Sequence, residues 1–315
     1  MDTFSAPHFH DDAAARKFLE GVLWPSGPVC PHCGVVGTGY AIKKPGVYRC
    51  AEKSCRKDFT VTMRTVMERS HIALHKWLQG FHLMTSSKKG VSAHQLHRTL
   101  DVTYRTAWFM CHRIREAMRA GGLSPLGGPG GSGIVEADET YYGPTEELRP
   151  RRKGAPPPTK GGRVGPAGKR AIVALVERGG KVRSFHVPRA DGETVTKIVR
   201  ENIDREARLM TDESPLYRKV GVEYATHETV KHSVKEYARG DVNTNTVEGY
   251  FSIFKRGMKG VYQHCKEKHL HRYLAEYDFR YNHREKVGYS DPMRTVEAVK
   301  GAEGKRLTYR QSSRP

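Results

Sequence analysis

Two pairs of cysteines near the start of the chain constrain its fold more than any other feature. Cys30 and Cys33 form the first pair, Cys50 and Cys55 form the second, and Gly34 directly follows the first pair. This arrangement has the spacing of a zinc ribbon, in which each pair lies on the turn of a small hairpin and all four sulfurs bind one Zn²⁺. The alternative is a loop of free thiols, which would require four cysteines to cluster without a shared ligand. We therefore expect a structural zinc site at these four residues.

The other cysteines and the N-terminus indicate a chain that stays in the cytoplasm. Cys111 and Cys265 are isolated in the sequence, and we expect both to be ordinary buried or partly buried thiols. The N-terminus lacks the basic and then apolar pattern of a signal peptide. No stretch approaches the roughly 18 consecutive apolar residues that a membrane-spanning helix needs. In a compartment where thiols stay reduced, paired cysteines bind metal more often than they form disulfides.

The charge of the chain indicates a polyanionic partner. Its 315 residues include 54 Lys and Arg against 34 Asp and Glu, which gives a formal net charge of +20. Nucleic acid is the favoured partner for such a chain, and an anionic membrane surface is a weaker alternative. With roughly 150 residues per domain, the length suggests about two domains.

Apolar spacing predicts helices on both sides of the cysteine pairs. One helix is expected at residues 11–24, and the 3–4 spacing of apolar residues from Leu74 to Met84 marks another. Residues 92–99 and 104–118 then read as a short helix and a longer basic helix joined by a tight turn, which is a helix-turn-helix pattern. The arginines expected to project from the longer helix toward DNA are Arg105, Arg113, Arg115 and Arg119. Periodicity alone does not separate this interpretation from a packed helical pair with solvated arginines.

A Gly- and Pro-rich linker at residues 121–133 separates this part from a second domain. Strand-like runs are expected at 134–142, 170–177, 181–187 and 207–211, with a helix at 192–204 and an edge strand within 224–232. This order suits a mixed sheet flanked by helices. An insertion at 149–170 holds eight Lys and Arg and no acid. It could follow a phosphate backbone, or it could be a solvated excursion.

Three acidic residues of the second domain lie in separate elements. Asp138 is in the first expected strand, Asp212 ends the run at 207–211, and Glu248 opens a helix with a clear apolar stripe. Lys255 follows Glu248 by two turns on the same face of that helix. Carboxylates brought together in this way form the oxygen site that Mg²⁺ prefers. The alternative for Glu248 is a capping box, in which Asn245 is the N-cap and Glu248 its reciprocal partner.

Taken in order, these motifs resemble a known family. Asp-Glu-Thr-Tyr at 138–141, Thr-Asp-Glu at 211–213, and Asn-Thr-Asn-Thr-Val-Glu at 243–248 followed by Lys-Arg-Gly at 255–257 resemble the insertion-sequence transposases with an ISXO-like domain, which belong to the DDE superfamily. The segment 269–284 resembles the closing helix of that group. The cysteine pairs, with residues 87–92 and 108–118, are similar to its N-terminal module. The likeness runs from about residue 10 to about residue 290.

The resemblance implies an α/β, RNase H-like catalytic domain that binds two Mg²⁺ ions, with Mn²⁺ as a substitute. Asp138 would bridge the ions, Asp212 and Glu248 would each complete one ion, and Lys255 would contact DNA beside the cut. Some relatives have Asn in place of the third acid, so Asn245 is a further candidate there. Arg256 and Lys259 are expected to contact DNA with Lys255. Glu136 and Glu139 are expected on the other face of the strand, in supporting roles.

The expected function is that of a transposase that binds double-stranded DNA, both the terminal inverted repeats and the target, and acts as a homo-oligomer. One alternative is an RNase H-like nuclease without strand transfer, and another is a non-catalytic zinc-dependent DNA-binding regulator. The expected divisions are an N-terminal helix at 1–25, a zinc ribbon at 26–65, a helix-turn-helix-like module at 66–120, the linker at 121–133, the catalytic domain at 134–288 with the basic insertion at 149–170, and a basic C-terminal tail at 289–315.

Overall fold

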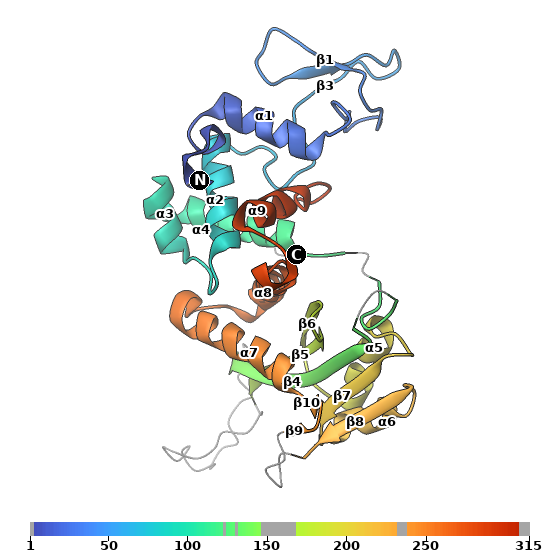
Figure 1. The fold of residues 1–315 in the computed structure, drawn as a ribbon. Coiled ribbons are helices and arrows are strands. Elements are labelled where there is room, and N and C mark those ends of the chain that lie inside the picture. Colours follow the sequence, from blue (N-terminus) through green and yellow to red (C-terminus); the bar gives the residue numbers. More distant parts are fainter. Residues whose placement is uncertain (1–2, 122–123, 130–131, 146–167, 232–237, 309–315) are drawn as a thin grey trace, which may run out of the picture. The chain divides into compact units, whose positions relative to one another are not determined.

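The computed structural model describes residues 3–121, 124–129, 132–145, 168–231 and 238–308 (Figure 1). These residues divide into two compact units. The helical unit comprises residues 1–120 and 283–315, and the sheet unit comprises residues 121–282. Most of the basic insertion expected at 149–170 lies outside the described residues. In the part of the chain that is described, no helix is both long and apolar enough to cross a membrane.

The sheet unit is built on a five-stranded sheet in the order β6-β5-β4-β7-β8. The two pairings among β4, β5 and β6 are antiparallel, whereas β7 runs parallel to both β4 and β8. The strands are β4 (Ile134–Pro144), β5 (Lys169–Glu177), β6 (Val182–Val187), β7 (Arg208–Asp212) and β8 (Thr226–Val230). A short hairpin, β9 (Ala238–Arg239) with β10 (Val242–Asn243), precedes helix α7. The expected α/β class, with a mixed sheet flanked by helices and an RNase H-like order, is confirmed.

Helices cover both faces of this sheet. On one face, alternate residues of β4 and β5 such as Val135 and Val173 pack against α5 (Gly192–Asn202). On the other face, Ile172 and Ala174 pack against α7 (Asn245–Gly257) and α8 (Leu270–Asn282). Because side chains alternate along a strand, residues of β4 with even numbers face α7 and those with odd numbers face α5.

Local sequence explains how these elements begin and end. The side chain of Asp191 accepts a hydrogen bond from the Thr194 N–H and caps α5. Between β7 and β8 lie a 3₁₀ turn (Pro215–Tyr217) and the short helix α6 (Arg218–Gly221). After α7 come a π-helical turn (Met258–Tyr262) and a 3₁₀ turn (Glu267–His269) that leads into α8.

The helical unit begins with two 3₁₀ turns, Thr3–Ser5 and Pro7–Phe9, and helix α1 (Asp12–Leu23). The cysteine-rich segment then forms a three-stranded sheet of β1 (Gly39–Ala41), β2 (Tyr48–Cys50) and β3 (Asp58–Phe59). Helices α2 (Leu74–Ser86), α3 (Ala93–Leu100) and α4 (Tyr104–Met118) follow. Ser92 caps α3 and Thr103 caps α4, and Asp101 adopts the left-handed conformation in the tight turn between these two helices.

The C-terminal part of the chain belongs to the helical unit and contains a 3₁₀ turn (Glu285–Val287) and helix α9 (Asp291–Lys300). Helix α9 packs against α1, α2 and α4. The Thr295 hydroxyl lies 3.0 Å from the His82 ring nitrogen Nδ1 and 3.3 Å from the Thr85 hydroxyl, both in α2. The described part of the expected basic tail, residues 289–308, therefore differs from a tail, because the buried side chains of Ala298, Val299 and Ala302 fill the core of a module that begins at the other end of the chain.

The expected linker also differs in part from a flexible segment. Leu126 is only 2% exposed and belongs to the core on the α5 face of the sheet. Its N–H donates to the Asn202 carbonyl, and its own carbonyl accepts from the Asp204 N–H. Gly127 has φ 75° and lies close to Ala207, where a Cβ atom would come within 2.6 Å of the Ala207 side chain. One apolar residue among glycines is thus enough to fix this segment to the sheet unit.

Candidate active site

Two neighbouring parallel strands bring Asp138 and Asp212 together. The register pairs Glu136 of β4 with Met210 of β7, so that Asp138 and Asp212, each two residues further on, reach the same level. Oxygen atoms of Asp138, Asp212 and a third acid, Glu139, lie within 4.8 Å of one another. Two of the three acids predicted from the sequence, Asp138 and Asp212, are therefore adjacent. The third member of the cluster is Glu139, which was expected only in a supporting role.

The Asp138 carboxyl group lies in an environment that disfavours its charge. Burial, and then the charges of Asp212 and Glu139, raise the pKa of Asp138 to about 8. The charge of Glu248 acts in the same direction, whereas the Glu139 N–H, 2.7 Å from the Asp138 Oδ1, opposes it. A carboxylate in this position needs a nearby cation to remain ionised at neutral pH.

Glu139 reaches the same cluster from the opposite face of β4. Its Oε2 accepts a hydrogen bond from the Tyr217 hydroxyl at 3.0 Å, and its Oε1 accepts a weaker one from the Ser214 hydroxyl at 3.4 Å. Burial and the charge of Asp212 raise the pKa of Glu139. Tyr217 is completely buried, so its hydroxyl fixes this carboxylate within the cluster. The signal in the sequence was the Asp138-Glu139 pair itself, because two adjacent acids in β4 can both reach the end of the neighbouring strand β7, where Asp212 lies.

Helix α7 carries the third predicted acid and the lysine. Glu248 is exposed and lies outside the group of oxygens within 4.8 Å, although its charge contributes to the raised pKa of Asp138. Its Oε1 accepts a hydrogen bond from the Thr244 hydroxyl at 3.0 Å. Lys255 is half-buried, and burial lowers the pKa of its ammonium group while the charge of Asp138 opposes this shift. Both side chains thus lie near enough to Asp138 to interact with its charge.

The capping of α7 differs from the predicted alternative. The N-cap is Thr244 rather than Asn245, and Glu248 lies one residue beyond the capping-box position. The free N–H groups of the first turn instead donate to Glu136: the Thr246 N–H at 2.8 Å and the Val247 N–H at 3.0 Å, both to Oε2. Glu136 was expected on the other face of the strand from Asp138, and this was wrong because residues two apart on a strand share a face.

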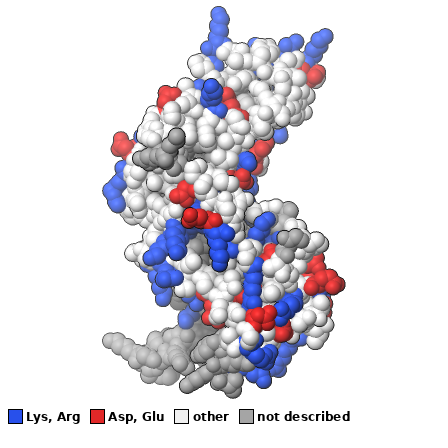
Figure 2. Space-filling view, in the orientation of Figure 1, with Lys and Arg blue, Asp and Glu red and all other residues white. Residues whose placement is uncertain are grey.

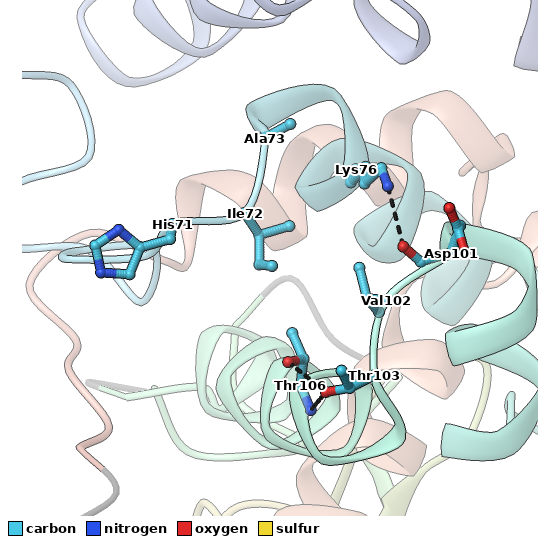
Figure 3. A pocket seen from close by; sticks show the side chains of 8 residues that line it. All are labelled: His71, Ile72, Ala73, Lys76, Asp101, Val102, Thr103 and Thr106. Atoms are coloured by element: carbon cyan, nitrogen blue, oxygen red, sulfur yellow. Dashed lines mark hydrogen bonds between the residues drawn. The ribbon is translucent and has the colours of Figure 1, made fainter.

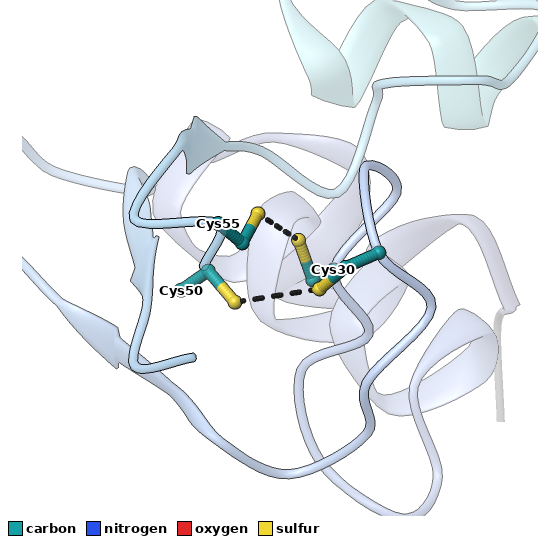
Figure 4. Close-up of side chains that lie close together, drawn as sticks. Cys30, Cys50 and Cys55 are labelled. Atoms are coloured by element: carbon teal, nitrogen blue, oxygen red, sulfur yellow. Dashed lines mark hydrogen bonds between the residues drawn. The ribbon is translucent and has the colours of Figure 1, made fainter. Parts of the chain in front are cut away.

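The four cysteines converge as predicted. Their sulfur atoms lie within 4.8 Å of one another, with Cys30 and Cys55 3.8 Å apart and Cys33 and Cys50 3.6 Å apart (Figure 4). A tetrahedron of sulfurs around zinc, with Zn–S bonds of about 2.3 Å, has edges of about 3.8 Å. Although burial opposes it, the N–H groups of Cys33 and His32 lower the pKa of the Cys30 thiol to about 7. The donor set and its spacing therefore fit one structural Zn²⁺.

The four arginines predicted to contact DNA from the second helix have different environments. Arg105 is exposed, and Arg119 is largely exposed and pairs with Glu116. Arg113 is 9% exposed and donates to the carbonyls of Leu307 and Glu68. Arg115 is 2% exposed. The burial of Arg113 and Arg115 argues against the prediction that they contact DNA, and Arg113 is held by Glu68 and by Leu307 in the segment after α9.

Basic residues at the end of α7 and in the turn after it remain accessible. Arg256 and Lys259 are exposed, and the Arg256 Nε donates to the Ser252 carbonyl within the helix. On the face drawn in Figure 2, Lys and Arg side chains are spread over both units, with acidic side chains between them. The two remaining single cysteines, Cys111 and Cys265, are buried.

A pocket of about 700 Å³ lies in the helical unit, between the start of α2 and the turn from α3 to α4 (Figure 3). Its lining includes Ile72, Val102 and Thr106, and the Lys76 ammonium group donates to the Asp101 carbonyl at its edge. A single carboxylate, that of Asp101, is among the lining residues, so this pocket does not offer the oxygen donors of the Asp138 cluster.

Comparison with known proteins agrees with this architecture. Residues 131–282 match the model of the ISXO2-like transposase domain, and residues 10–58 match that of the transposase zinc-ribbon domain. The chain is also 28% identical over 285 residues to an uncharacterized protein in the transposable element ISH50 of Halobacterium salinarum, which covers 86% of this chain and 91% of that protein. The chain therefore belongs to the insertion-sequence transposases that combine a transposase zinc ribbon with an ISXO2-like transposase domain.

Proposed function

We propose that this protein is a DDE-type transposase that cleaves DNA at the ends of its element and joins the exposed ends to target DNA. The observation that carries the proposal is the cluster formed by the middle of β4 and the end of β7, where carboxylate oxygens lie within 4.8 Å of one another and the pKa of Asp138 is raised to about 8. Crowded carboxylates of this kind are costly unless a cation neutralises them. Oxygen donors alone favour a hard ion such as Mg²⁺, with Mn²⁺ as a substitute.

In this proposal Asp138 contributes to both of two metal sites, Asp212 completes one, and Glu248 completes the other. Paired ions would neutralise charge on the attacking and leaving oxygens of a phosphodiester. Lys255 lies on α7 near Asp138, where its ammonium group can bind the phosphate at the cut. The same site would first activate water to free a 3′-hydroxyl and then position that hydroxyl for attack on target DNA.

DNA binding would involve both units. Arg105 on α4 and Arg119 directly after it are proposed to contact the terminal inverted repeat. Lys255 and Arg256 on α7 and Lys259 in the turn after it are proposed to contact DNA near the active site. The zinc ribbon would be held by Cys30, Cys33, Cys50 and Cys55, and elemental analysis is expected to find one zinc per chain. A homo-oligomer on DNA is part of the proposal, and gel filtration with element-end DNA tests it.

The direct test incubates purified protein with labelled element-end DNA, unlabelled target DNA and Mg²⁺. We expect nicked products and joined products, and Asp138→Asn or Asp212→Asn should abolish both while leaving binding of end DNA nearly unchanged. Nicked products without joined ones would favour an RNase H-like nuclease. Binding without either product, in protein and DNA shown to be intact, would favour a non-catalytic zinc-dependent regulator.

A second pair of variants distinguishes Glu248 from Asn245 as the third metal ligand. Because Glu136 satisfies the N–H groups of α7, Glu248 is not needed as a cap, and Glu248→Gln is expected to abolish cleavage without loss of helix stability. Full activity in Glu248→Gln together with loss of activity in Asn245→Ala would transfer the third ligand position to Asn245.

A further inference from the structure

Helix α7 is capped by a buried acid from another element. Glu136, on strand β4, is 0% exposed. Besides the two N–H groups of Thr246 and Val247, its carboxylate accepts a hydrogen bond from the Thr246 hydroxyl at 2.8 Å. The N-cap residue Thr244 makes no side-chain capping bond of its own. The N–H groups at the start of a helix require acceptors, and a negative charge is stabilised there by the helix dipole.

Arg178 connects the same carboxylate to the segment that leads into α7. Its Nε donates to the Glu136 Oε1 at 2.6 Å. Its two terminal nitrogens donate to backbone carbonyls on either side of Val242, with Nη1 2.6 Å from the Asp241 oxygen and Nη2 2.9 Å from the Asn243 oxygen. Arg178 directly follows β5, so this pair joins β4, β5, β10 and α7 through one guanidinium group and one carboxylate.

Glu136 also has a fixed relation to the proposed catalytic residues. It precedes Asp138 by two residues on the same face of β4, a separation of about 6.7 Å along a strand. On the helix, its partners Thr246 and Val247 directly precede Glu248. A single side chain therefore sets the distance between the strand that carries one proposed metal ligand and the helical turn that carries another.

We propose that Glu136, held by Arg178, is a positioning residue that places Glu248 opposite Asp138 so that the metal site forms. This inference rests on the proposed function, since it concerns the same site. Glu136 itself is occupied by its four donors, the two N–H groups, the Thr246 hydroxyl and Arg178, and does not bind the ion. Its role requires a charged acceptor, because both the helix start and the guanidinium group favour an anion.

The test replaces Glu136 with Gln, which keeps the shape of the side chain but removes the charge and introduces an amide donor among the existing donors. The matched control is Glu177→Gln. Glu177 is another buried acid of this sheet, at a position that pairs with Val135, and its Oε1 accepts the Ser132 N–H at 2.9 Å. Both variants lose a buried carboxylate, but only the first changes the start of α7.

Two quantities are measured on the full chain: the affinity for Mn²⁺ in the absence of DNA, by electron paramagnetic resonance, and the Mg²⁺ concentration that gives half-maximal cleavage. Replacing residues that orient metal ligands typically weakens metal binding by about 10–100-fold. We therefore expect Glu136→Gln to weaken Mn²⁺ binding and raise the half-maximal Mg²⁺ concentration by about tenfold. Circular dichroism and end-DNA binding should stay unchanged, and Glu177→Gln should keep the metal dependence of the unmodified protein.

Arg178→Lys provides a second variant if Glu136→Gln does not fold. It keeps a cation beside Glu136 but removes at least one of the bonds to Asp241 and Asn243, and it should shift the metal dependence in the same direction by a smaller factor. Unchanged Mn²⁺ affinity in a folded Glu136→Gln protein, or an equal change in Glu177→Gln, would overturn the positioning role. Retained cleavage in Asp138→Asn would instead overturn the proposed function, so the two failures are distinguishable.

Discussion

At the scale of single residues, the acids in the middle of β4 and at the end of β7 lower the stability of the protein in the absence of a cation. Asp138, Glu139 and Asp212 have oxygens within 4.8 Å of one another, and their mutual repulsion contributes to the raised pKa values of Asp138 and Glu139. Functional sites often retain such unfavourable arrangements at the expense of stability. The residues that would hold a metal should therefore destabilise the protein when no metal is bound.

We predict that Asp212→Asn raises the free energy of unfolding by about 1 kcal/mol in EDTA, because it removes one charge from a repulsive cluster. The Asn side chain can still accept the Ser214 N–H through its Oδ1. Added Mg²⁺ should raise the melting temperature of the unmodified protein and leave that of the variant nearly unchanged. Thermal unfolding with and without Mg²⁺ measures both effects, with the exposed Glu206→Gln as control. A lower melting temperature for Asp212→Asn in EDTA would mean that hydrogen bonds outweigh the repulsion.

A second buried acid makes the stability of the protein depend on pH. Asp278 on α8 accepts hydrogen bonds from the Ser184 N–H and hydroxyl and from the Tyr250 hydroxyl, and burial raises its pKa from an ordinary value of 3.8 to about 7. Between these values the folded state binds more protons than the unfolded state, so stability falls as the pH rises through this window. Each unit of pKa difference corresponds to about 1.4 kcal/mol, which gives a loss on the order of 4 kcal/mol by pH 8.

Asp278→Asn should remove this dependence. Urea unfolding at pH 5 and pH 8 is expected to show that the unmodified protein loses more stability with rising pH than the variant does. Asp191→Asn is the control, because the Thr194 N–H lowers the pKa of Asp191 and its titration falls below this window. An identical pH dependence in Asp278→Asn and the unmodified protein would show that Asp278 is ionised throughout.

At the scale of elements, sequence patterns predicted the elements that depend on residues close to them in the sequence. The strands that became β4 to β7 and the Asp191 cap of α5 follow from alternation and from turn residues. The alternation of side chains along β4 could also have placed Glu136 on the face that α7 covers, because residues 136 and 138 lie on the same face of a strand. The cap that Glu136 provides could not be predicted, because its partners lie 110 and 111 residues further along the chain.

Helix α4 illustrates the same limit. Its predicted apolar stripe, which includes Ala107 and Ile114, is buried. Periodicity also left Arg113 and Arg115 outside that stripe, yet both are buried. Arg113 donates to the Leu307 carbonyl in the segment that follows α9, a helix that packs on α4. A basic residue outside an apolar stripe is accessible only if no distant segment returns to cover it.

The packing of α9 against the N-terminal helices gives a prediction at the scale of elements. Val299 is completely buried, whereas Met293 on the same helix is 48% exposed. Val299→Asp would bury a charge without a partner and should lower the free energy of unfolding of the helical unit by about 3 kcal/mol or more, while Met293→Asp should change it by less than about 0.5 kcal/mol. Urea unfolding monitored by tryptophan fluorescence suits this test, because all three Trp residues of the chain belong to the helical unit. Equal stability of the two variants would mean that α9 is not part of the folded module.

At the scale of the whole molecule, the net charge of +20 predicted a nucleic-acid partner. It did not predict which Lys and Arg side chains would contact that partner. Seven basic residues in or directly after α4 and α7 were expected to bind phosphates, and the burial of Arg113 and Arg115 reduces this set to five. Each neutralised phosphate contributes about −0.9 to the slope of log affinity against log salt. The expected slope therefore changes from about −6 to about −4.5, because charge counts toward binding only where the fold leaves it accessible.

Substitution of two arginines of α4 tests this revised salt slope. Arg105→Met removes an exposed cation and should reduce the magnitude of the salt slope by about 1, with the loss of affinity larger for element-end DNA than for random DNA if α4 reads base edges. Arg115→Met removes a buried cation and should leave the slope unchanged while altering thermal stability. Fluorescence anisotropy titrations at several salt concentrations measure the slopes. If the unmodified protein has a salt slope near −6 and Arg115→Met reduces its magnitude, α4 must separate from the segment that covers it when DNA binds. If the unmodified protein, Arg105→Met and Arg115→Met have equal slopes, α4 is not part of the DNA interface.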